Sequence, residues 1–214
     1  MANKQKYGKW EVKEEIYRHI FLVKRDDQLG ALKIDRNPER NTIKKEAKIL
    51  SQLDHPNIVK LLDYDLEAET PYLVTEYHSH HSLSFTDLND WKTSDRRKFF
   101  YQYCDAVAYC HSKEIAKYDH KLGNIVLDED ESPIVIDFGS SSKHLNESSI
   151  SNDIKGLGRF FWEIMEGKRL VEFSSNPNIR SAYPNHKERY LQRKIQKLQE
   201  DIDELKQQKA ELLS

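Results

Sequence analysis

The stretch KYDHKLGNIVLDEDESPIVIDFGSS, residues 117–141, decides how the rest of this 214-residue chain is interpreted. It places Asp119, Lys121, Asn124 and Asp137 on loops beside short apolar strands. Carboxylate and amide oxygens bind hard cations such as Mg²⁺, and a lysine ammonium attracts phosphate. The stretch therefore predicts a site for a cation and phosphate groups. The rest of the chain decides whether this site is active or a relic.

Composition narrows the class of protein. The formal net charge is −2 and no apolar run reaches the length of a membrane span, so neither a nucleic acid nor a membrane is expected as a partner. The start, MANKQKYGKW, contains no apolar run of the signal-peptide kind. Cys104 and Cys110 both lie in a helical pattern, which argues against a disulfide framework and favours a reducing, cytoplasmic setting.

The amino-terminal part is predicted to form a small antiparallel sheet with one helix. Two β-rich runs, HIFLVK and GALKID, flank a hairpin turn in which Gly30 is expected to adopt a left-handed conformation. Apolar residues at three-to-four spacing predict an amphipathic helix over about residues 38–53, with Glu46 beside its apolar stripe. NIVKLLDYDL and PYLVTEY predict a second strand pair.

The middle of the chain is predicted to be mainly helical. The polar run HSHHSL, residues 78–83, could connect two lobes. One helix is expected over about residues 94–112 and another over residues 153–166, whose apolar residues are too dense for a solvated surface. The opening stretch lies between them and adds two short strands.

The last residues carry a heptad repeat. Residues spaced alternately by four and three from Leu191 to Leu212 are apolar except for Lys209, with Ile195 and Ile202 at a positions and leucines at d positions. This choice favours a parallel dimer, so a homodimer through residues 188–213 is expected. The alternative is a single amphipathic helix that folds back on the body, because only about three heptads are present.

Several motifs together resemble the eukaryotic-type serine/threonine protein kinases. LDHPNIVKLLDY resembles the turn after the regulatory helix, PYLVTEY the strand entering the hinge, CDAVAYCHSKEI the helix before the catalytic loop, and IVIDFG the metal-binding motif. The resemblance runs from about Trp10 to Lys168. It implies an α+β, two-lobed fold with a small antiparallel β-sheet lobe, a truncated helical lobe and a coiled-coil helix. The predicted boundaries are 9–77 and 78–172 for the lobes, 173–186 for a linker and 187–214 for the helix.

The resemblance assigns four residues to phosphoryl transfer. Asp119 would accept the proton of the substrate hydroxyl or orient it, and Lys121 would neutralise charge on the transferred group. Asn124 and Asp137 would hold Mg²⁺.

It assigns five more residues to binding ATP. Lys33 would hold the α and β phosphates, and Glu46 would pair with Lys33 and keep its long side chain aimed. The backbone of Glu76 and His78 would meet adenine, and Thr75 would occupy the gatekeeper position.

The chain also departs from the family. No glycine lies between Gly8 and Gly30, so the glycine-rich loop is missing and the first two strands are expected to join through a tight turn. The family's His-Arg-Asp becomes Lys117-Tyr118-Asp119, and this lysine must either reach solvent or find an acid. The segment from Gly139 to Asp153 is too short for a phosphorylated activation loop, and neither an Ala-Pro-Glu motif nor the remaining helices of the large lobe are found.

Three functions remain open at this stage. The first is a minimal ATP- and Mg²⁺-dependent kinase that phosphorylates serine or threonine on itself or a partner, without activation-loop phosphorylation. The second is an inactive pseudokinase that acts as a dimeric partner-binding module. The third is a small-molecule kinase of the aminoglycoside type, because Gly123 precedes Asn124. Metal binding by His78, His80 and His81 is disfavoured, since no compact set of further ligands accompanies them.

Overall fold

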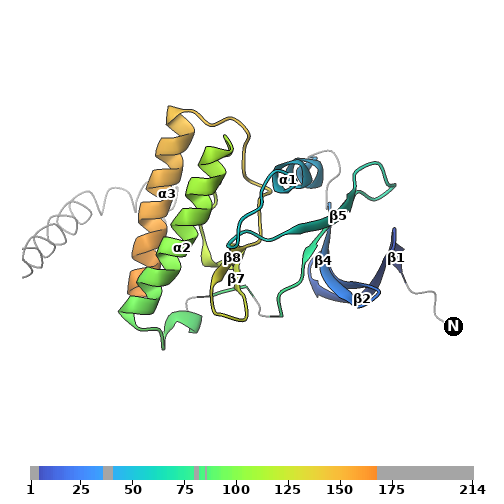
Figure 1. The fold of residues 1–214 in the computed structure, drawn as a ribbon, viewed down its shortest axis with the longest axis horizontal. Coiled ribbons are helices and arrows are strands. Elements are labelled where there is room, and N and C mark those ends of the chain that lie inside the picture. Colours follow the sequence, from blue (N-terminus) through green and yellow to red (C-terminus); the bar gives the residue numbers. More distant parts are fainter. Residues whose placement is uncertain (1–4, 36–40, 80–81, 85, 168–214) are drawn as a thin grey trace, which may run out of the picture. The chain divides into compact units, whose positions relative to one another are not determined.

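The computed structural model describes residues 5–35, 41–79, 82–84 and 86–167 (Figure 1). The predicted linker and heptad helix, residues 173–214, lie outside the described residues. Within the described part, no helix is both long enough and apolar enough to cross a membrane.

Six strands form one antiparallel sheet in the order β1-β2-β3-β4-β6-β5 (Figure 1). Their bounds are Lys6–Tyr7 for β1, Trp10–Tyr17 for β2, Ile20–Arg25 for β3, Gln28–Ile34 for β4, Leu61–Asp65 for β5 and Tyr72–Glu76 for β6. One face of the sheet buries a small core of Trp10, Val23, Leu32, Tyr72 and Val74. Both predicted strand pairs are therefore confirmed, and β1 adds a short strand at the edge.

The hairpin between β3 and β4 turns at a different place from the one predicted. Arg25 pairs with Gln28, so the turn consists of Asp26 and Asp27, and Asp26 has φ 54°. The prediction for Gly30 is wrong, because Gly30 lies inside β4 opposite Glu76. A Cβ at this glycine would come within 2.5 Å of the Val74 side chain, so close packing requires glycine here.

The helix α1 spans Thr42–Leu50, shorter than the predicted 38–53. Asp35 sets its start, because one carboxylate oxygen accepts hydrogen bonds from the Thr42 and Ile43 N–H groups. Ile43 and Ala47 pack against Leu73 of the sheet. This packing turns the neighbouring position, Glu46, toward the sheet, as the sequence predicts.

The second part of the structure contains two long helices and a strand pair. These are α2 (Thr93–Ser112), β7 (Ile125–Leu127), β8 (Pro133–Val135) and α3 (Glu147–Glu166), with short 3₁₀ turns η2 (Thr86–Leu88) and η3 (Leu122–Asn124). The predicted start of the helix over residues 153–166 is wrong. Asn146 caps α3 seven residues before Asp153, since its side chain accepts from Ser149 N–H and the Ser149 hydroxyl accepts from Asn146 N–H.

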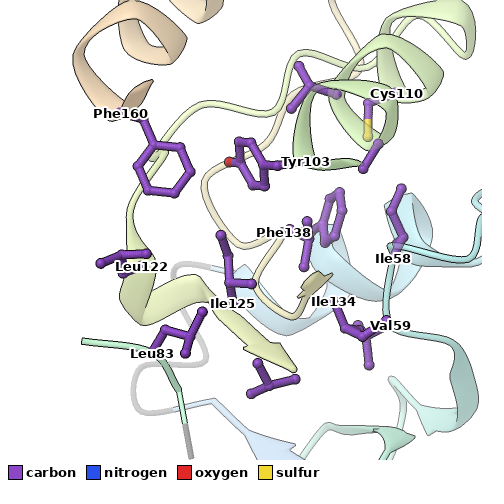
Figure 2. Close-up of a cluster of buried hydrophobic side chains, with 14 of the residues drawn as sticks. Ile58, Val59, Leu83, Tyr103, Cys110, Leu122, Ile125, Ile134, Phe138 and Phe160 are labelled. Carbon is purple, nitrogen blue, oxygen red and sulfur yellow. The ribbon is translucent and has the colours of Figure 1, made fainter. Parts of the chain in front are cut away.

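The larger core lies among these elements (Figure 2). Phe99, Tyr103 and Cys110 of α2 share it with Phe160 of α3, and the two short strands contribute to the same core. Phe138 is fully buried within it. Packing of Phe138 therefore fixes the backbone beside Asp137.

The segment after α1 ties the sheet to the helical part. Val59 N–H donates to Val135 O, Val135 N–H donates to Asn57 O, and the buried Asn57 side chain donates to Pro133 O at 2.9 Å. Glu76 N–H in β6 donates to Lys60 O. The predicted turn DHPN therefore ends in a short clamp on β8, which holds the Asp137 loop next to the sheet.

Candidate active site

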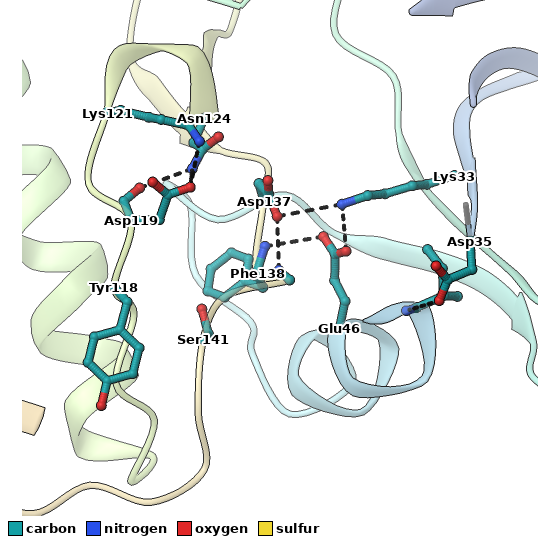
Figure 3. Close-up of polar contacts among 12 residues, drawn as sticks. Lys33, Asp35, Glu46, Tyr118, Asp119, Lys121, Asn124, Asp137, Phe138 and Ser141 are labelled. Atoms are coloured by element: carbon teal, nitrogen blue, oxygen red, sulfur yellow. Dashed lines mark hydrogen bonds and ion pairs between the residues drawn. The ribbon is translucent and has the colours of Figure 1, made fainter. Parts of the chain in front are cut away.

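Three elements meet in one polar network (Figure 3). Lys33 on β4 places its Nζ 2.7 Å from Glu46 Oε2 on α1 and 3.5 Å from Asp137 Oδ1 after β8. The second oxygen of Glu46 accepts a hydrogen bond from Phe138 N–H at 3.1 Å. Glu46 thus joins the lysine of the sheet to the backbone of the Asp137 loop, which positions the lysine side chain.

Burial and charge act in opposite directions in this network. Burial raises the pKa of Glu46, whose side chain is 1% exposed, despite the attraction of Lys33. Burial alone would lower the pKa of Lys33, but Glu46 and Asp137 outweigh it and raise that pKa. Asp137 is more exposed, and Lys33 and the Gly139 N–H lower its pKa in spite of desolvation. Lys33 and Asp137 are therefore both charged near neutral pH.

A second network surrounds Asp119 (Figure 3). Lys121 Nζ lies 2.6 Å from Asp119 Oδ2, and Asn124 Nδ2 donates to both Asp119 O and Asp119 Oδ2 at 3.0 Å. Burial alone would raise the pKa of Asp119, but these hydrogen bonds and the nearby lysine charges lower it. The carboxylate is ionised and held in one orientation.

The donor set fits a hard divalent cation. Asn124 donates through its nitrogen, which leaves its Oδ1 as the atom that can ligate a cation, and Asp137 supplies carboxylate oxygens. Among the described residues, no group of three or more His, Cys, Asp or Glu side chains could hold a metal. Mg²⁺ commonly binds through one or two carboxylates together with substrate phosphates, so a sparse oxygen set suits it.

The backbone around Asp119 is strained and firmly braced. Tyr118 and Asp119 have φ values of 51° and 45°, a left-handed conformation that non-glycine residues rarely adopt. The fully buried Asp153 of α3 accepts hydrogen bonds from Lys117 N–H at 2.8 Å and Tyr118 N–H at 2.7 Å. These two bonds hold the strained turn.

Two histidines that the sequence did not single out complete this brace. His120 Nε2 and His111 Nε2 lie 2.9 and 2.8 Å from the two oxygens of Asp153. Gly156 allows the arrangement, because a Cβ there would lie 2.4 Å from His120 Cδ2. A glycine inside a helical pattern was the available signal, since such a glycine commonly marks close packing.

A cavity of about 550 Å³ lies between the sheet and the strand pair. Eight of the nine predicted site residues line it: Lys33, Glu46, Thr75, Glu76, His78, Lys121, Asn124 and Asp137. Apolar walls come from Ala31, Leu73, Val126 and Ile136. Asp119 lies outside this lining and borders a neighbouring cavity of about 290 Å³ with Tyr118 and Lys155. Asp119, which the sequence predicts to be catalytic, therefore lies outside the lining of the large cavity.

The turn between β2 and β3, which forms the roof of the large cavity, is short. Tyr17 pairs with Ile20, so β2 and β3 join through Arg18 and His19 alone, which confirms the predicted tight turn. Ile16, Tyr17 and Ile20 line the cavity, and His19 N–H donates to the Glu15 carboxylate. The turn therefore covers the cavity with side chains and presents few backbone N–H groups to a phosphate.

The family model for the protein kinase domain matches residues 18–161, more than half of the chain. The chain belongs to the protein kinase family. This match spans both polar networks and the Asp153 brace, and it confirms the resemblance to eukaryotic-type protein kinases. The antiparallel sheet with its one helix is the kinase-like small lobe.

The curated relatives of this protein kinase chain include proteins named as calcium-dependent, serine/threonine and CBL-interacting protein kinases. Calcium-dependent protein kinase 5 of Plasmodium berghei is 34% identical over 155 residues, which are 69% of this chain and 28% of the relative. Probable serine/threonine-protein kinase MARK-C of Dictyostelium discoideum is 38% identical over 109 residues, 49% of this chain and 14% of the relative. CBL-interacting protein kinase 26 of Oryza sativa subsp. japonica is 37% identical over 108 residues, 50% of this chain and 21% of the relative. The chain spans less than a third of each of these relatives.

Proposed function

We propose that this chain is an ATP- and Mg²⁺-dependent kinase that transfers the γ-phosphoryl group to serine or threonine hydroxyls of itself or of a partner protein. One observation carries the proposal. Lys33, Glu46 and Asp137 come from three separate elements and form one network, while Lys121 and Asn124 orient Asp119 at the edge of the same cavity. Six independent side chains rarely converge in this way without a shared task.

Each group has a distinct part in the transfer. Lys33 binds the phosphates of ATP, and Glu46 keeps the lysine extended toward them. Asn124 Oδ1 and Asp137 would hold Mg²⁺, which supplies positive charge to the phosphate oxygens when bound. Asp119, ionised by its low pKa, orients the attacking hydroxyl and receives its proton. Lys121 then stabilises negative charge on the transferred group, so the chain's own residues supply positioning and electrostatic stabilisation.

We further propose that the site needs no activation-loop phosphorylation. Only the residues from Ser140 to Asn146 separate Gly139 from α3, and Ser141 is buried with its hydroxyl on Lys117 O. Tyr118 replaces the arginine that would read a phosphorylated loop. The carboxylate of Asp153 holds the strained turn directly, through the Lys117 and Tyr118 N–H groups.

Phosphate transfer from labelled ATP with Mg²⁺ tests the proposal directly. Asp119→Asn and Asp137→Asn should each lower transfer by roughly 10²- to 10⁴-fold, the usual effect of removing a proton acceptor or a metal ligand. Asp130→Asn is the matched control, because Asp130 is an exposed residue of the loop between β7 and β8. Transfer that survives in both site variants would contradict these roles.

A pseudokinase is the second candidate, and the cavity roof favours it. The two-residue turn and the Glu15 carboxylate on His19 N–H remove backbone donors that would cover phosphates. A parent protein that transfers no label and whose melting temperature is unchanged by ATP would support this candidate.

Homodimerisation through residues 188–213 remains a proposal under either function, and sedimentation of the chain with and without those residues tests it.

A further inference from the structure

Asp35 links the strand that carries Lys33 to the start of α1 (Figure 3). It follows β4 directly, two residues after Lys33, and side chains two residues apart on an extended strand point to the same side. Its Oδ2 accepts hydrogen bonds from Thr42 N–H at 3.0 Å and from Ile43 N–H at 3.3 Å. The same stretch of chain therefore contacts α1 twice, through Asp35 at its first turn and through Lys33 at Glu46 one turn later.

The start of α1 depends on an acceptor from outside the helix. The helix contains nine residues, and helices this short are marginal without support from the rest of the fold. Its first turn contains no acidic residue, and the Asn41 side chain makes no capping hydrogen bond among the described residues. Asp35 thus supplies both the acceptor and the negative charge that the N-terminus of a helix favours.

The first turn of α1 lies against the loop that carries Asp137. A Cβ at Gly139 would come within 3.2 Å of Thr42 Cγ2 and of Asp137 Oδ1. One turn further along the helix, Glu46 accepts a hydrogen bond from Phe138 N–H at 3.1 Å. A shift of the first turn of α1 would therefore disturb this loop at both points.

We propose that Asp35 is a positioning residue of this site: by fixing the start of α1 on the sheet, it places Glu46 and, through Glu46, aims Lys33 at the phosphates of ATP. The inference rests on the proposed function, because it concerns the same site, and it adds how the site is kept assembled. Asp35 is not among the described residues that line the large cavity, so it acts without touching the nucleotide. The contact lies within the chain, so the chain itself holds α1 in place.

The first test compares the binding of ATP and of adenosine by calorimetry in saturating Mg²⁺. Adenosine lacks the phosphates that Lys33 would hold, so its affinity should not depend on where Lys33 points. Asp35→Ala removes the acceptor at the start of α1 and should weaken ATP binding about tenfold, with a change in adenosine binding below about twofold. A merely structural role would change the two affinities alike.

Two variants control this comparison. Asp35→Asn keeps an oxygen acceptor on a side chain of the same length and should bind ATP within about threefold of the parent. Asp65→Ala is the matched control, because Asp65 Oδ1 also accepts two backbone hydrogen bonds, from the N–H groups of Glu67 and Ala68 at 3.0 Å. Asp65 is exposed at the end of β5, outside the site, so its variant should keep the ratio of the two affinities within about twofold of the parent ratio.

A double variant tests the route through Glu46. If Asp35 acts by placing Glu46, its removal matters only while the Glu46 carboxylate is present. In a Glu46→Gln background, Asp35→Ala should therefore change the ratio of the two affinities by less than about twofold. An undiminished effect in that background would overturn the inference.

The second test is hydrogen exchange of the Phe138 amide, measured by NMR, which needs no nucleotide. Asp35→Ala should speed this exchange on the order of tenfold, because Glu46 then loses its fixed position opposite Phe138 N–H, and Asp65→Ala should leave it unchanged. Circular dichroism identifies a variant that fails to fold, and Asp35→Ser then replaces Asp35→Ala.

Two results would each overturn the inference. One is an equal ratio of the ATP and adenosine affinities in the parent and in Asp35→Ala, and the other is an unchanged exchange rate of the Phe138 amide. If the parent binds no ATP, the proposed function fails, and the Phe138 amide still decides whether Asp35 positions Glu46.

Discussion

A single carboxylate holds the strained turn at Tyr118 and Asp119. Asp153 is fully buried and takes part in four hydrogen bonds, two with the backbone of Lys117 and Tyr118 and two with His111 and His120. Hydrogen bonds to a charged acceptor are stronger than neutral ones, and losing the acceptor leaves buried donors unpaired. The strained conformation of Tyr118 and Asp119 therefore depends on this residue.

Asp153→Asn should lower the free energy of unfolding by about 2–4 kcal/mol at pH 7, since the amide cannot accept all four bonds. Urea denaturation measures the change. Thr93→Ser, at the exposed start of α2, is a control expected to change the free energy of unfolding by less than about 0.5 kcal/mol.

The same residue predicts a dependence of stability on pH. Burial alone would raise the pKa of Asp153, but its hydrogen bonds outweigh burial and depress the pKa far below the ordinary 3.8. A depressed carboxyl pKa stabilises the fold above the unfolded pKa, and that stabilisation is lost as pH falls from about 4 toward the folded pKa. The parent should lose stability steeply below pH 4, and Asp153→Asn should lose less. Parallel curves for the two proteins would contradict this assignment.

At the scale of elements, α3 supports the strained turn at Tyr118 and Asp119 through Asp153. Gly156 faces His120, whereas a methyl group added at Gly158 would meet no atom of the described residues within 4 Å. The two glycines lie in one helix, two residues apart. Their substitutions separate the need for close packing from the general cost of glycine in a helix.

Gly156→Ala should destabilise the protein by about 1–3 kcal/mol and slow phosphate transfer, because the new methyl group displaces His120 from Asp153. Gly158→Ala should stabilise the helix by up to about 1 kcal/mol and leave transfer unchanged. Thermal denaturation and a transfer assay of both variants give the comparison. An equally active, equally stable Gly156→Ala protein would show that His120 does not need its observed position.

At the scale of the whole molecule, the site exists because the sheet is clamped to the helical part. Lys33 and Glu46 come from the sheet and its helix, and Asp137 comes from the loop after β8. The segment through Asn57 and Val59 bonds directly to β8. Relative movement of the two parts would separate Lys33 from Asp137.

Asn57→Ala should remove one buried hydrogen bond of this clamp and cost about 1–2 kcal/mol of stability. The local effect should be larger than the global one, so the Val59 and Val135 amides should exchange hydrogen faster than the amides of α2. Hydrogen exchange followed by mass spectrometry or NMR measures both regions. Uniform acceleration across the molecule would show that Asn57 acts only on global stability.

The sequence by itself determined the family and the order of the elements, because hydrophobic periodicity and turn residues act over short stretches of chain. It located Asp119, Lys121, Asn124 and Asp137 for the same reason, since these residues lie within one local motif. It misplaced the turn at Gly30 and the start of α3, because steric contact with Val74 and the capping pair Asn146 and Ser149 are visible only in three dimensions.

Only the tertiary structure decided how charge is distributed in the site. The two histidines on Asp153 and the buried side chain of Lys117 belong to contacts between residues distant in sequence. From the sequence alone, the Lys117 side chain was expected either to reach solvent or to pair with an acid. The fold places it under the Phe138 ring instead, because the Asp153 and Ser141 hydrogen bonds fix its backbone and the core closes around its side chain. Packing between distant parts of the described chain thus sets the surroundings of a site of which a short motif already contains four residues.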